Sequence, residues 1–397
     1  MRKHIAVILA LGAVSLAGCT GLGKGTLAGP VQHTTVTPDG WALSLLHYQP
    51  ASDPGQRLPV ILCHGLSYNA TFWDLADEVS LAKYLQRAGY DVWVPSLRGA
   101  GWSTKPPLSR LRQLFRGDLR TAGGVFTSAG RGVLKLNWNV DDHVRGDIPA
   151  ILKFVAEKTG RKKAFWVGHS MGGMILVAHL AERTDEGRLA GFVALGVPVF
   201  IIPPLSEPLK MMAESRGAFE LSNAMVSTNL PAVLGAIGGG KLASPIDVLF
   251  YNPANVSPDV VRRLNIAGTD DISPGQLAQL VDMVSTGSFR SADGKTDHTA
   301  ALGRMAVPAL FCAGTVDNLA TVGAVKKLYH QWGAKEKSFR LFGVVNAQRS
   351  DYGHDDLVIG RHARLEVYPV IRRWLDDRCG IKPRLELPLP LAGVKLK

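Results

Sequence analysis

The sequence predicts an α/β fold with a mostly parallel central sheet, helices on both faces and a helical cap insertion. From Leu58 onward, apolar strand-like runs alternate with helical patterns, as they do where helices join parallel strands. A tight Gly-x-Ser-x-Gly turn, Gly168 to Gly172, separates one such run from the helical pattern after it. The alternation stops at Pro198 and resumes after Arg304, which indicates an insertion.

The composition is that of a globular protein. The chain has 397 residues, of which 46% are hydrophobic and 20% charged. Its formal net charge of +12 favours anionic surfaces such as lipid head groups, but a solvated basic surface explains that charge more simply. The basic residues are dispersed and form no nucleic-acid motif, so we expect no nucleic-acid partner. No Cys-x-x-Cys pair or His/Cys cluster indicates a metal site. The sequence carries no signal for the oligomeric state.

The first 18 residues predict a lipoprotein signal peptide. A basic start is followed by an apolar run from Ile5 to Leu16, which is too short to span a bilayer comfortably. The run ends in Leu16-Ala17-Gly18-Cys19, which resembles the bacterial lipobox. The resemblance implies cleavage before Cys19, attachment of lipid to it and a place in the bacterial cell envelope. The alternative is a plain secretory signal with an incidental cysteine.

The residue after the cysteine bears on the destination. In Gram-negative lipoproteins an aspartate there favours the inner membrane, so Thr20 points by resemblance to the outer membrane. The predicted organisation is then a signal peptide (1–18), a lipidated cysteine with a Gly-rich tether (19–30), a first part of the core (31–198), a mostly helical cap (199–304), a second part of the core (305–378) and a tail (379–397).

Local signals place the elements of the first part of the core. Pro38-Asp39-Gly40 predicts the turn of a hairpin, Gly89 fits the end of a helix, and Pro149 predicts a kink or restart in a helical pattern. The expected strands are Val31 to Thr37, Trp41 to Tyr48, Leu58 to Cys63, Tyr90 to Pro95, Ala164 to Val167 and Gly191 to Val197, and the expected helices cover Phe72 to Ala88, Val144 to Val155 and Gly173 to Leu180.

In the cap, Ser257-Pro258 and Ser273-Pro274 each look like the start of a helix. After it we expect strands at Pro308 to Ala313 and Lys337 to Val345, and helices at Asn318 to Trp332 and from about Leu357 to Asp377. The irregular, arginine-rich stretch from Lys105 to Leu136 fits either a basic lid or membrane-facing loop, or a solvated insertion.

Ser170 is the candidate nucleophile, because the strand-turn-helix context pushes its hydroxyl clear of the sheet. A serine needs a base to take its proton and an acid to orient that base. His354 and Asp317 meet these needs in the expected chain order, and each follows a late strand.

Other residues of the same types compete for these roles. Asp293 and Asp297 lie in the presumed cap, and His298, His330 and His362 are better explained as surface or packing residues. Asp355 and Asp356 fit the first turn of a helix, and His169 fits a structural neighbour of the serine.

The loop His64-Gly65-Leu66, directly after an apolar strand, predicts an oxyanion hole. Ester cleavage needs two donors where negative charge develops. We expect the backbone amides of Leu66 and Met171 to provide them, and His64 only to brace the loop.

These residues carry a resemblance to the α/β-hydrolase superfamily, most of all to its acid-lipase branch of gastric and lysosomal lipases. The motifs are His64-Gly65-Leu66 with Phe72-Trp73, Ala88 to Trp93 with Arg98-Gly99, Asp147 to Ala150, Val167 to Gly173 and Tyr352 to Leu357. The resemblance covers the core but not the cap. The same branch resembles polyester (polyhydroxyalkanoate) synthases, whose nucleophile is a cysteine, so Ser170 argues against that role.

The resemblance implies a membrane-anchored serine esterase or lipase that acts on an ester or lipid substrate and needs no cofactor. An acyltransferase on the same triad is an alternative. A non-catalytic binding lipoprotein is another, although a binder would have no need of serine, histidine, acid and oxyanion loop together.

Overall fold

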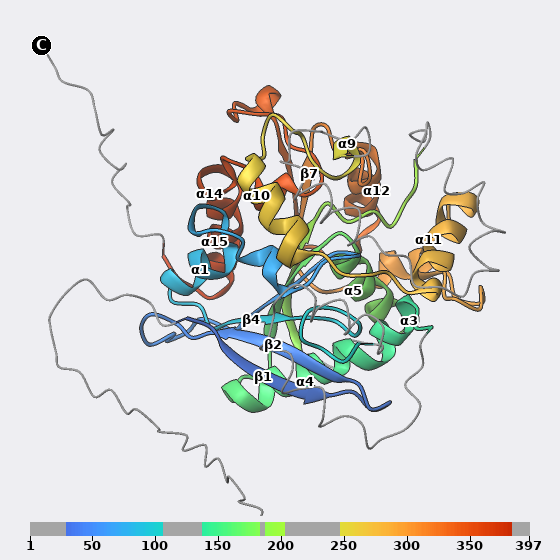
Figure 1. Ribbon diagram of the computed structural model, residues 1–397, viewed down its shortest axis with the longest axis horizontal. Helices are drawn as coiled ribbons and strands as arrows, with labels where there is room; N and C mark the ends of the chain where they lie inside the picture. Colours follow the sequence, from blue (N-terminus) through green and yellow to red (C-terminus); the bar gives the residue numbers. More distant parts are fainter. Residues whose placement is uncertain (1–28, 106–136, 183–186, 203–246, 383–397) are drawn as a thin grey trace, which may run out of the picture.

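The computed structural model describes residues 29–105, 137–182, 187–202 and 247–382 (Figure 1). The predicted signal peptide, the predicted lipidation site Cys19, nearly all of the arginine-rich stretch and much of the predicted cap lie outside these residues.

The described residues form an eight-stranded sheet in the order β1-β2-β4-β3-β5-β6-β7-β8. Strands β1, β2 and β4 pair antiparallel, and every pair from β4 through β8 is parallel, which confirms the mostly parallel sheet. The strands are β1 (Val31–Val36), β2 (Ala42–Tyr48), β3 (Val60–Cys63), β4 (Val92–Pro95), β5 (Ala164–His169), β6 (Leu189–Leu195), β7 (Ala309–Gly314) and β8 (Lys337–Phe342).

Helices cover the sheet. They are α1 (Leu81–Arg87), α3 (Val140–Asp142), α4 (Ile148–Thr159), α5 (Met171–Glu182), α9 (Asp247–Phe250), α10 (Pro258–Arg263), α11 (Pro274–Thr286), α12 (Val322–Gln331), α13 (Asp356–Ile359), α14 (Ala363–Glu366) and α15 (Tyr368–Arg378). Short 3-10 turns are η1 (Ala70–Trp73), η2 (Asp77–Val79), η6 (His298–Arg304) and η7 (Val344–Asn346), and π-helical turns are η4 (His143–Asp147) and η5 (Leu264–Gly268).

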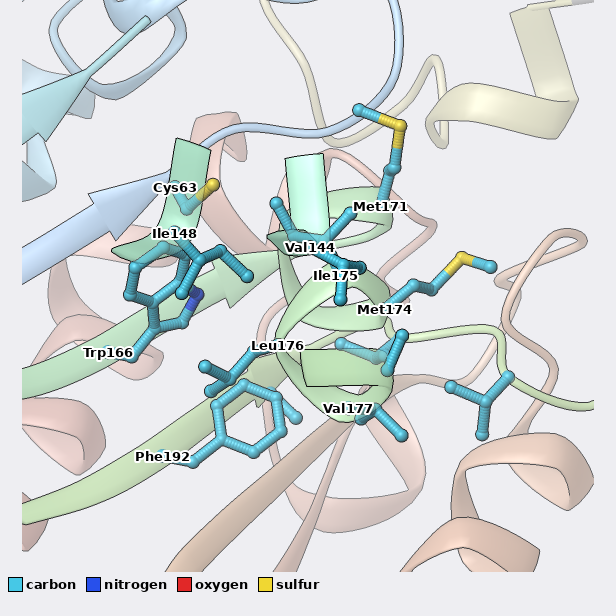
Figure 2. Packing of buried hydrophobic residues seen from close by; sticks show 14 of the residues in the cluster. Cys63, Val144, Ile148, Trp166, Met171, Met174, Ile175, Leu176, Val177 and Phe192 are labelled. Carbon is cyan, nitrogen blue, oxygen red and sulfur yellow. The ribbon is translucent and has the colours of Figure 1, made fainter. Parts of the chain in front are cut away.

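Strand β3 shows that both faces of the sheet are covered. Its four side chains are all buried. Ile61 and Cys63 belong to the hydrophobic cluster that includes α4, α5 and α12, whereas Val60 and Leu62 belong to the cluster that includes α1 and α15. Because successive strand residues face opposite sides, the two clusters lie on opposite faces. Figure 2 shows the first cluster around α5.

Two predicted helices are wrong in extent. The stretch from Phe72 to Ala88 holds the turns η1 and η2 before α1, which begins only where the Ser80 side chain accepts a hydrogen bond from the amide of Lys83. The last helix is divided into α13, α14 and α15. At the first division the chain turns at Gly360, where a Cβ would lie 2.4 Å from the Asp356 carbonyl oxygen.

The proline signals are confirmed. Pro149 lies in the first turn of α4, directly after η4, so the helical pattern restarts there. Ser257 caps α10 and Ser273 caps α11, each with a proline in the first turn that follows. The hairpin of β1 and β2 also turns where Pro38-Asp39-Gly40 predicted.

The buried guanidinium of Arg98 connects the loop after β4 to the core through hydrogen bonds. Arg98 Nε donates to Oδ1 of Asp147 at 2.8 Å, and its NH1 donates to Oδ2 of Asp39 at 2.7 Å. His143 donates from Nδ1 to the other oxygen of Asp147 at 2.7 Å. Burial alone would raise the pKa of Asp147, but the His143 hydrogen bond and the Arg98 charge outweigh it and lower that pKa.

We predict that Asp147→Asn destabilises the protein by about 3–5 kcal/mol, because it leaves a buried guanidinium with only its Asp39 partner. Urea unfolding measures the loss. The control is Asp77→Asn, which removes a surface pair with Lys83 and should cost less than about 1 kcal/mol. Equal losses in the two variants would contradict the role assigned to Asp147.

Candidate active site

Ser170 lies at the sharp turn between β5 and α5. Its φ of +51° is left-handed, a conformation that an L-residue adopts only under strain. A Cβ at Gly168 would lie 2.6 Å from the Gly172 carbonyl oxygen, and a Cβ at Gly172 would lie 2.3 Å from the carbonyl oxygen of Cys63. The turn therefore has room only for glycine at both positions.

Hydrogen bonds hold this turn in place. The Ser170 amide donates to the Leu195 carbonyl of β6 at 3.0 Å, and the Ser170 carbonyl accepts from Gly173 and Met174 at 2.9 and 3.1 Å. The indole of Trp166 donates to the Gly172 carbonyl at 2.9 Å. The strained backbone is thus fixed from the strand beside it and from within its own strand and helix.

The structure brings two of the three predicted triad residues into direct contact. Nδ1 of His354 donates to Oδ2 of Asp317 at 2.9 Å, and both side chains are buried. The other oxygen of Asp317 accepts from the amides of Leu319 and Ala320 at 2.9 and 2.7 Å. With both carboxylate oxygens engaged, Asp317 is held in one orientation and fixes the tautomer of the imidazole.

The neighbouring strands explain this convergence. Asp317 follows β7 and His354 follows β8, and these strands are parallel neighbours. Gly196, just after β6, lies against both: a Cβ there would be 3.1 Å from Oδ2 of Asp317 and 3.2 Å from Nδ1 of His354. The ring of His354 also lies 4.8 Å from that of His169, the residue before Ser170.

The second ring nitrogen of His354, Nε2, takes no part in the hydrogen bond to Asp317. Nε2 is buried and has no hydrogen-bond partner among the described residues. Burial lowers the pKa of His354, but the Asp317 carboxylate, with smaller contributions from Asp355 and Asp356, outweighs burial and raises that pKa above the ordinary 6.5. The site therefore holds a histidine that accepts a proton more readily than a free imidazole does.

The predicted oxyanion loop lies against Ser170, the predicted nucleophile. A Cβ at Gly65 would be 3.1 Å from Cβ of Ser170. Among the described residues, neither the Leu66 nor the Met171 amide donates to a backbone carbonyl, which is consistent with the predicted role of oxyanion donors. His64 braces the loop: it donates from Nδ1 to the Gly65 carbonyl at 2.8 Å and accepts from the Leu97 amide at 3.1 Å. Burial lowers the pKa of His64 to about 4.

A small pocket of about 10 Å³, the space of about one water molecule, lies next to Gly65 and Met171. Gly65 and Met171 form part of its wall, together with polar side chains that include His143, Asp271 and Gln276. The pocket therefore admits no more than a water-sized group, and its wall is partly polar.

The sequence did not predict the buried surroundings of His354. Asp356 lies in the first turn of α13 as expected, but both it and Asp355 are fully buried. Asp356 accepts from Asn255 at 2.9 Å, and Asp355 accepts from the hydroxyl of Tyr68 at 2.5 Å. Tyr68 and Asp355 are 287 positions apart, so no local pattern could have paired them.

His169, His354 and Asp355 form the cluster of metal-ligating side chains found among the described residues, with one atom from each within 4.8 Å of the others. His354 already uses Nδ1 for Asp317, and its Nε2 is the atom a serine hydroxyl requires. The cluster is thus the inner part of the site described above, and we assign no metal to it.

Comparison with known proteins agrees with this geometry. A family described as the alpha/beta hydrolase fold matches residues 59–243. The chain has the α/β-hydrolase fold. Among solved structures, the chain is similar to a soluble variant of monoglyceride lipase from Saccharomyces cerevisiae, with a TM-score of 0.57, 14% identity and coverage of 89% of this chain and 97% of that one. It is also similar to the monoacylglycerol lipase of Paleococcus ferrophilus, with a TM-score of 0.54 and 19% identity over 85% and 99%.

The sequence relatives are distant acid lipases. Gastric triacylglycerol lipase of Rattus norvegicus is 31% identical over 189 residues, and human lysosomal acid lipase/cholesteryl ester hydrolase is 29% identical over 187. These matches cover 46% and 45% of this chain but only 42% and 41% of the relatives' own lengths. Lipase member K of Mus musculus is 26% identical over 87% of both chains. In the described part of this chain, no helix is long and apolar enough to cross a bilayer.

We predict that a fluorophosphonate labels Ser170 at a rate that falls with decreasing pH, with a midpoint above 6.5. The sign follows because only neutral His354 can accept the serine proton, and the Asp317 carboxylate raises its pKa. Asp317→Asn should lower that midpoint and slow labelling by about 10⁴-fold, the usual effect of losing the orienting acid. Asp351→Asn, in the loop before His354, is the control. Equal labelling of Asp317→Asn and wild type would exclude Asp317 as the orienting acid.

Proposed function

We propose that this protein is a serine hydrolase of carboxylic esters, with Ser170, His354 and Asp317 as its triad. The observation that carries the proposal is the buried hydrogen bond between His354 and Asp317, beside a serine held at a positive φ. The unpartnered Nε2 of His354 supports it, because a general base needs a free lone pair. The names of the distant lipase relatives support the same reaction class.

In the first half of the reaction, Oγ of Ser170 attacks the ester carbonyl carbon while Nε2 of His354 takes its proton. The amides of Leu66 and Met171 donate to the oxyanion that forms, and losing one such donor typically costs about 10²–10³ in turnover. Collapse of the tetrahedral intermediate breaks the bond to the alcohol, which leaves with the proton from His354. Water then attacks the acyl-enzyme by the same route, and the carboxylic acid is released.

For the substrate we propose esters of fatty acids, because the relatives are a triacylglycerol lipase and a cholesteryl ester hydrolase by name. The small pocket that Gly65 and Met171 line holds no more than a water-sized group, so the proposal of a fatty acyl chain does not rest on it.

We predict that the soluble form beginning after Cys19 hydrolyses p-nitrophenyl esters, and that Ser170→Ala abolishes turnover without unfolding the protein. A series from acetate to palmitate reports the preferred acyl length, and circular dichroism checks the fold. Ser222→Ala, a serine outside the elbow, is the matched control. Full activity in Ser170→Ala would contradict the elbow assignment. Labelling of Ser170 without turnover of any ester would favour an acyltransferase over a hydrolase.

We further propose that the protein is anchored in the bacterial cell envelope through lipid on Cys19, in the outer membrane if the host is Gram-negative. The support is the lipobox-like Leu16-Ala17-Gly18-Cys19 and the threonine after it. Cys19→Ser in the full chain should move the protein from the membrane to the soluble fraction, whereas Thr20→Ser should leave it at the membrane. A Cys19→Ser variant that still fractionates with membranes would exclude this anchor.

A further inference from the structure

Three segments of the candidate site meet at one buried carboxyl group, that of Asp355. Tyr68, in the loop that carries the predicted oxyanion amide, donates its hydroxyl to Oδ2 at 2.5 Å. His169, the neighbour of Ser170, lies with Nε2 3.6 Å from Oδ1. Asp355 itself follows His354 directly. The oxyanion loop, the elbow and the histidine loop are thus linked through the carboxyl group of Asp355.

His169 strengthens this link. Burial lowers the pKa of His169 well below 6.5, so the ring is neutral and carries one N–H. Nε2 faces two oxygens, the His354 carbonyl at 3.1 Å and Oδ1 of Asp355 at 3.6 Å. The proton therefore belongs on Nε2, which donates to the His354 carbonyl. This hydrogen bond holds the backbone of the histidine loop against the strand that ends at Ser170.

The electrostatics of Asp355 couple it to His354. A carboxylate oxygen of Asp355 and a ring nitrogen of His354 lie within 4.8 Å of one another. The titratable groups that face Asp355 are Tyr68, His169 and His354, with Asp356 and Asp317 contributing at longer range. Burial raises the pKa of Asp355 to about 7, against the opposing effects of His354 and the Tyr68 hydrogen bond. Protonation of His354 therefore favours the ionised form of Asp355. Ionisation of Asp355 in turn favours protonation of His354.

We propose that Asp355, held by Tyr68, is a positioning residue that shares with Asp317 the stabilisation of protonated His354. Each time Ser170 gives its proton to Nε2, the new positive charge lies near two carboxylates: Asp317, hydrogen-bonded to the ring, and Asp355, with an oxygen within 4.8 Å of a ring nitrogen. This inference rests on the proposed function, since it assumes that His354 is protonated during turnover. The proposal assigns to Tyr68 the role of holding Asp355 in position to stabilise that charge.

The test compares Asp355→Asn and Tyr68→Phe with a matched control, Tyr90→Phe. Tyr90 donates to Asp376 at 2.7 Å in another buried Tyr–Asp pair that joins residues 286 positions apart, away from the site. The readouts are thermal stability, kcat and KM for a p-nitrophenyl ester, the pH dependence of Ser170 labelling, and the NMR titration of the His354 ring.

Asp355→Asn should lower the pKa of His354, and with it the acid midpoint of labelling, by about one pH unit, because a carboxylate at this distance is lost. We expect kcat to fall about tenfold with KM nearly unchanged. The positive charge on His354 that Asp355 stabilises is absent from the enzyme–substrate complex and develops only on the way to the transition state. Tyr68→Phe should move the midpoint and kcat in the same direction by less. Tyr90→Phe should change stability alone.

Two results would overturn the proposal: an unchanged His354 titration in Asp355→Asn, or equal effects of Tyr68→Phe and Tyr90→Phe on kcat and midpoint. If Asp355→Asn does not fold, Tyr68→Phe decides alone. Failure of the proposed function looks different, because the wild type would then show neither ester turnover nor Ser170 labelling. The NMR titration would still report whether Asp355 sets the pKa of His354.

Discussion

The close approach of the elbow to the backbone of β3 is the constraint on which the rest of the site depends. Ser170 keeps its positive φ only because Gly172 lets the first turn of α5 lie against the Cys63 and His64 carbonyls. A side chain at Gly172 would push α5 away from β3. The same contact brings the loop after β3 beside the serine, so Gly168 and Gly172 set the positions of both the predicted nucleophile and the predicted oxyanion loop.

The order of the strands then brings the remaining groups to the serine. Strands β5, β6, β7 and β8 are consecutive parallel neighbours, and their carboxyl ends share one edge. Asp317 and His354 leave that edge from adjacent strands, which is why residues 37 positions apart form a 2.9 Å hydrogen bond. Both are buried, so little water competes for that bond, and the charge on Asp317 acts on the imidazole at a low dielectric constant.

Local sequence patterns predicted most of the sheet and the pairing of Asp317 with His354, because strand alternation and motif order depend on short-range chemistry. The patterns failed where side-chain contacts determine the local structure or the surroundings of a residue. The stretch from Phe72 to Ala88 breaks into turns because side-chain caps at Asn69 and Ser80 compete with the helix. Asp355 looked like an ordinary first-turn acid, yet its partner Tyr68 is 287 positions away. The structure shows the contact between Asp317 and His354, whereas the roles of all the site residues, Ser170, Asp317, His354, Leu66, Met171 and Cys19, stay predictions.

The buried hydrogen-bond network of Arg98, Asp147 and His143 extends to the small pocket beside Met171. His143 donates to Asp147 through Nδ1 and accepts from the Gln276 amide through Nε2 at 2.9 Å. Gln276 belongs to α11, within the predicted cap, and its side-chain nitrogen also lies 3.7 Å from the sulfur of Met171. Asp147, which holds Arg98 in the loop after β4, thus also holds α11 beside the elbow through His143 and Gln276. The hydrogen bond between His143 and Gln276 thus joins α11 to the core at the wall of the small pocket beside Met171, so the position of this wall depends on the same buried carboxylate that holds Arg98.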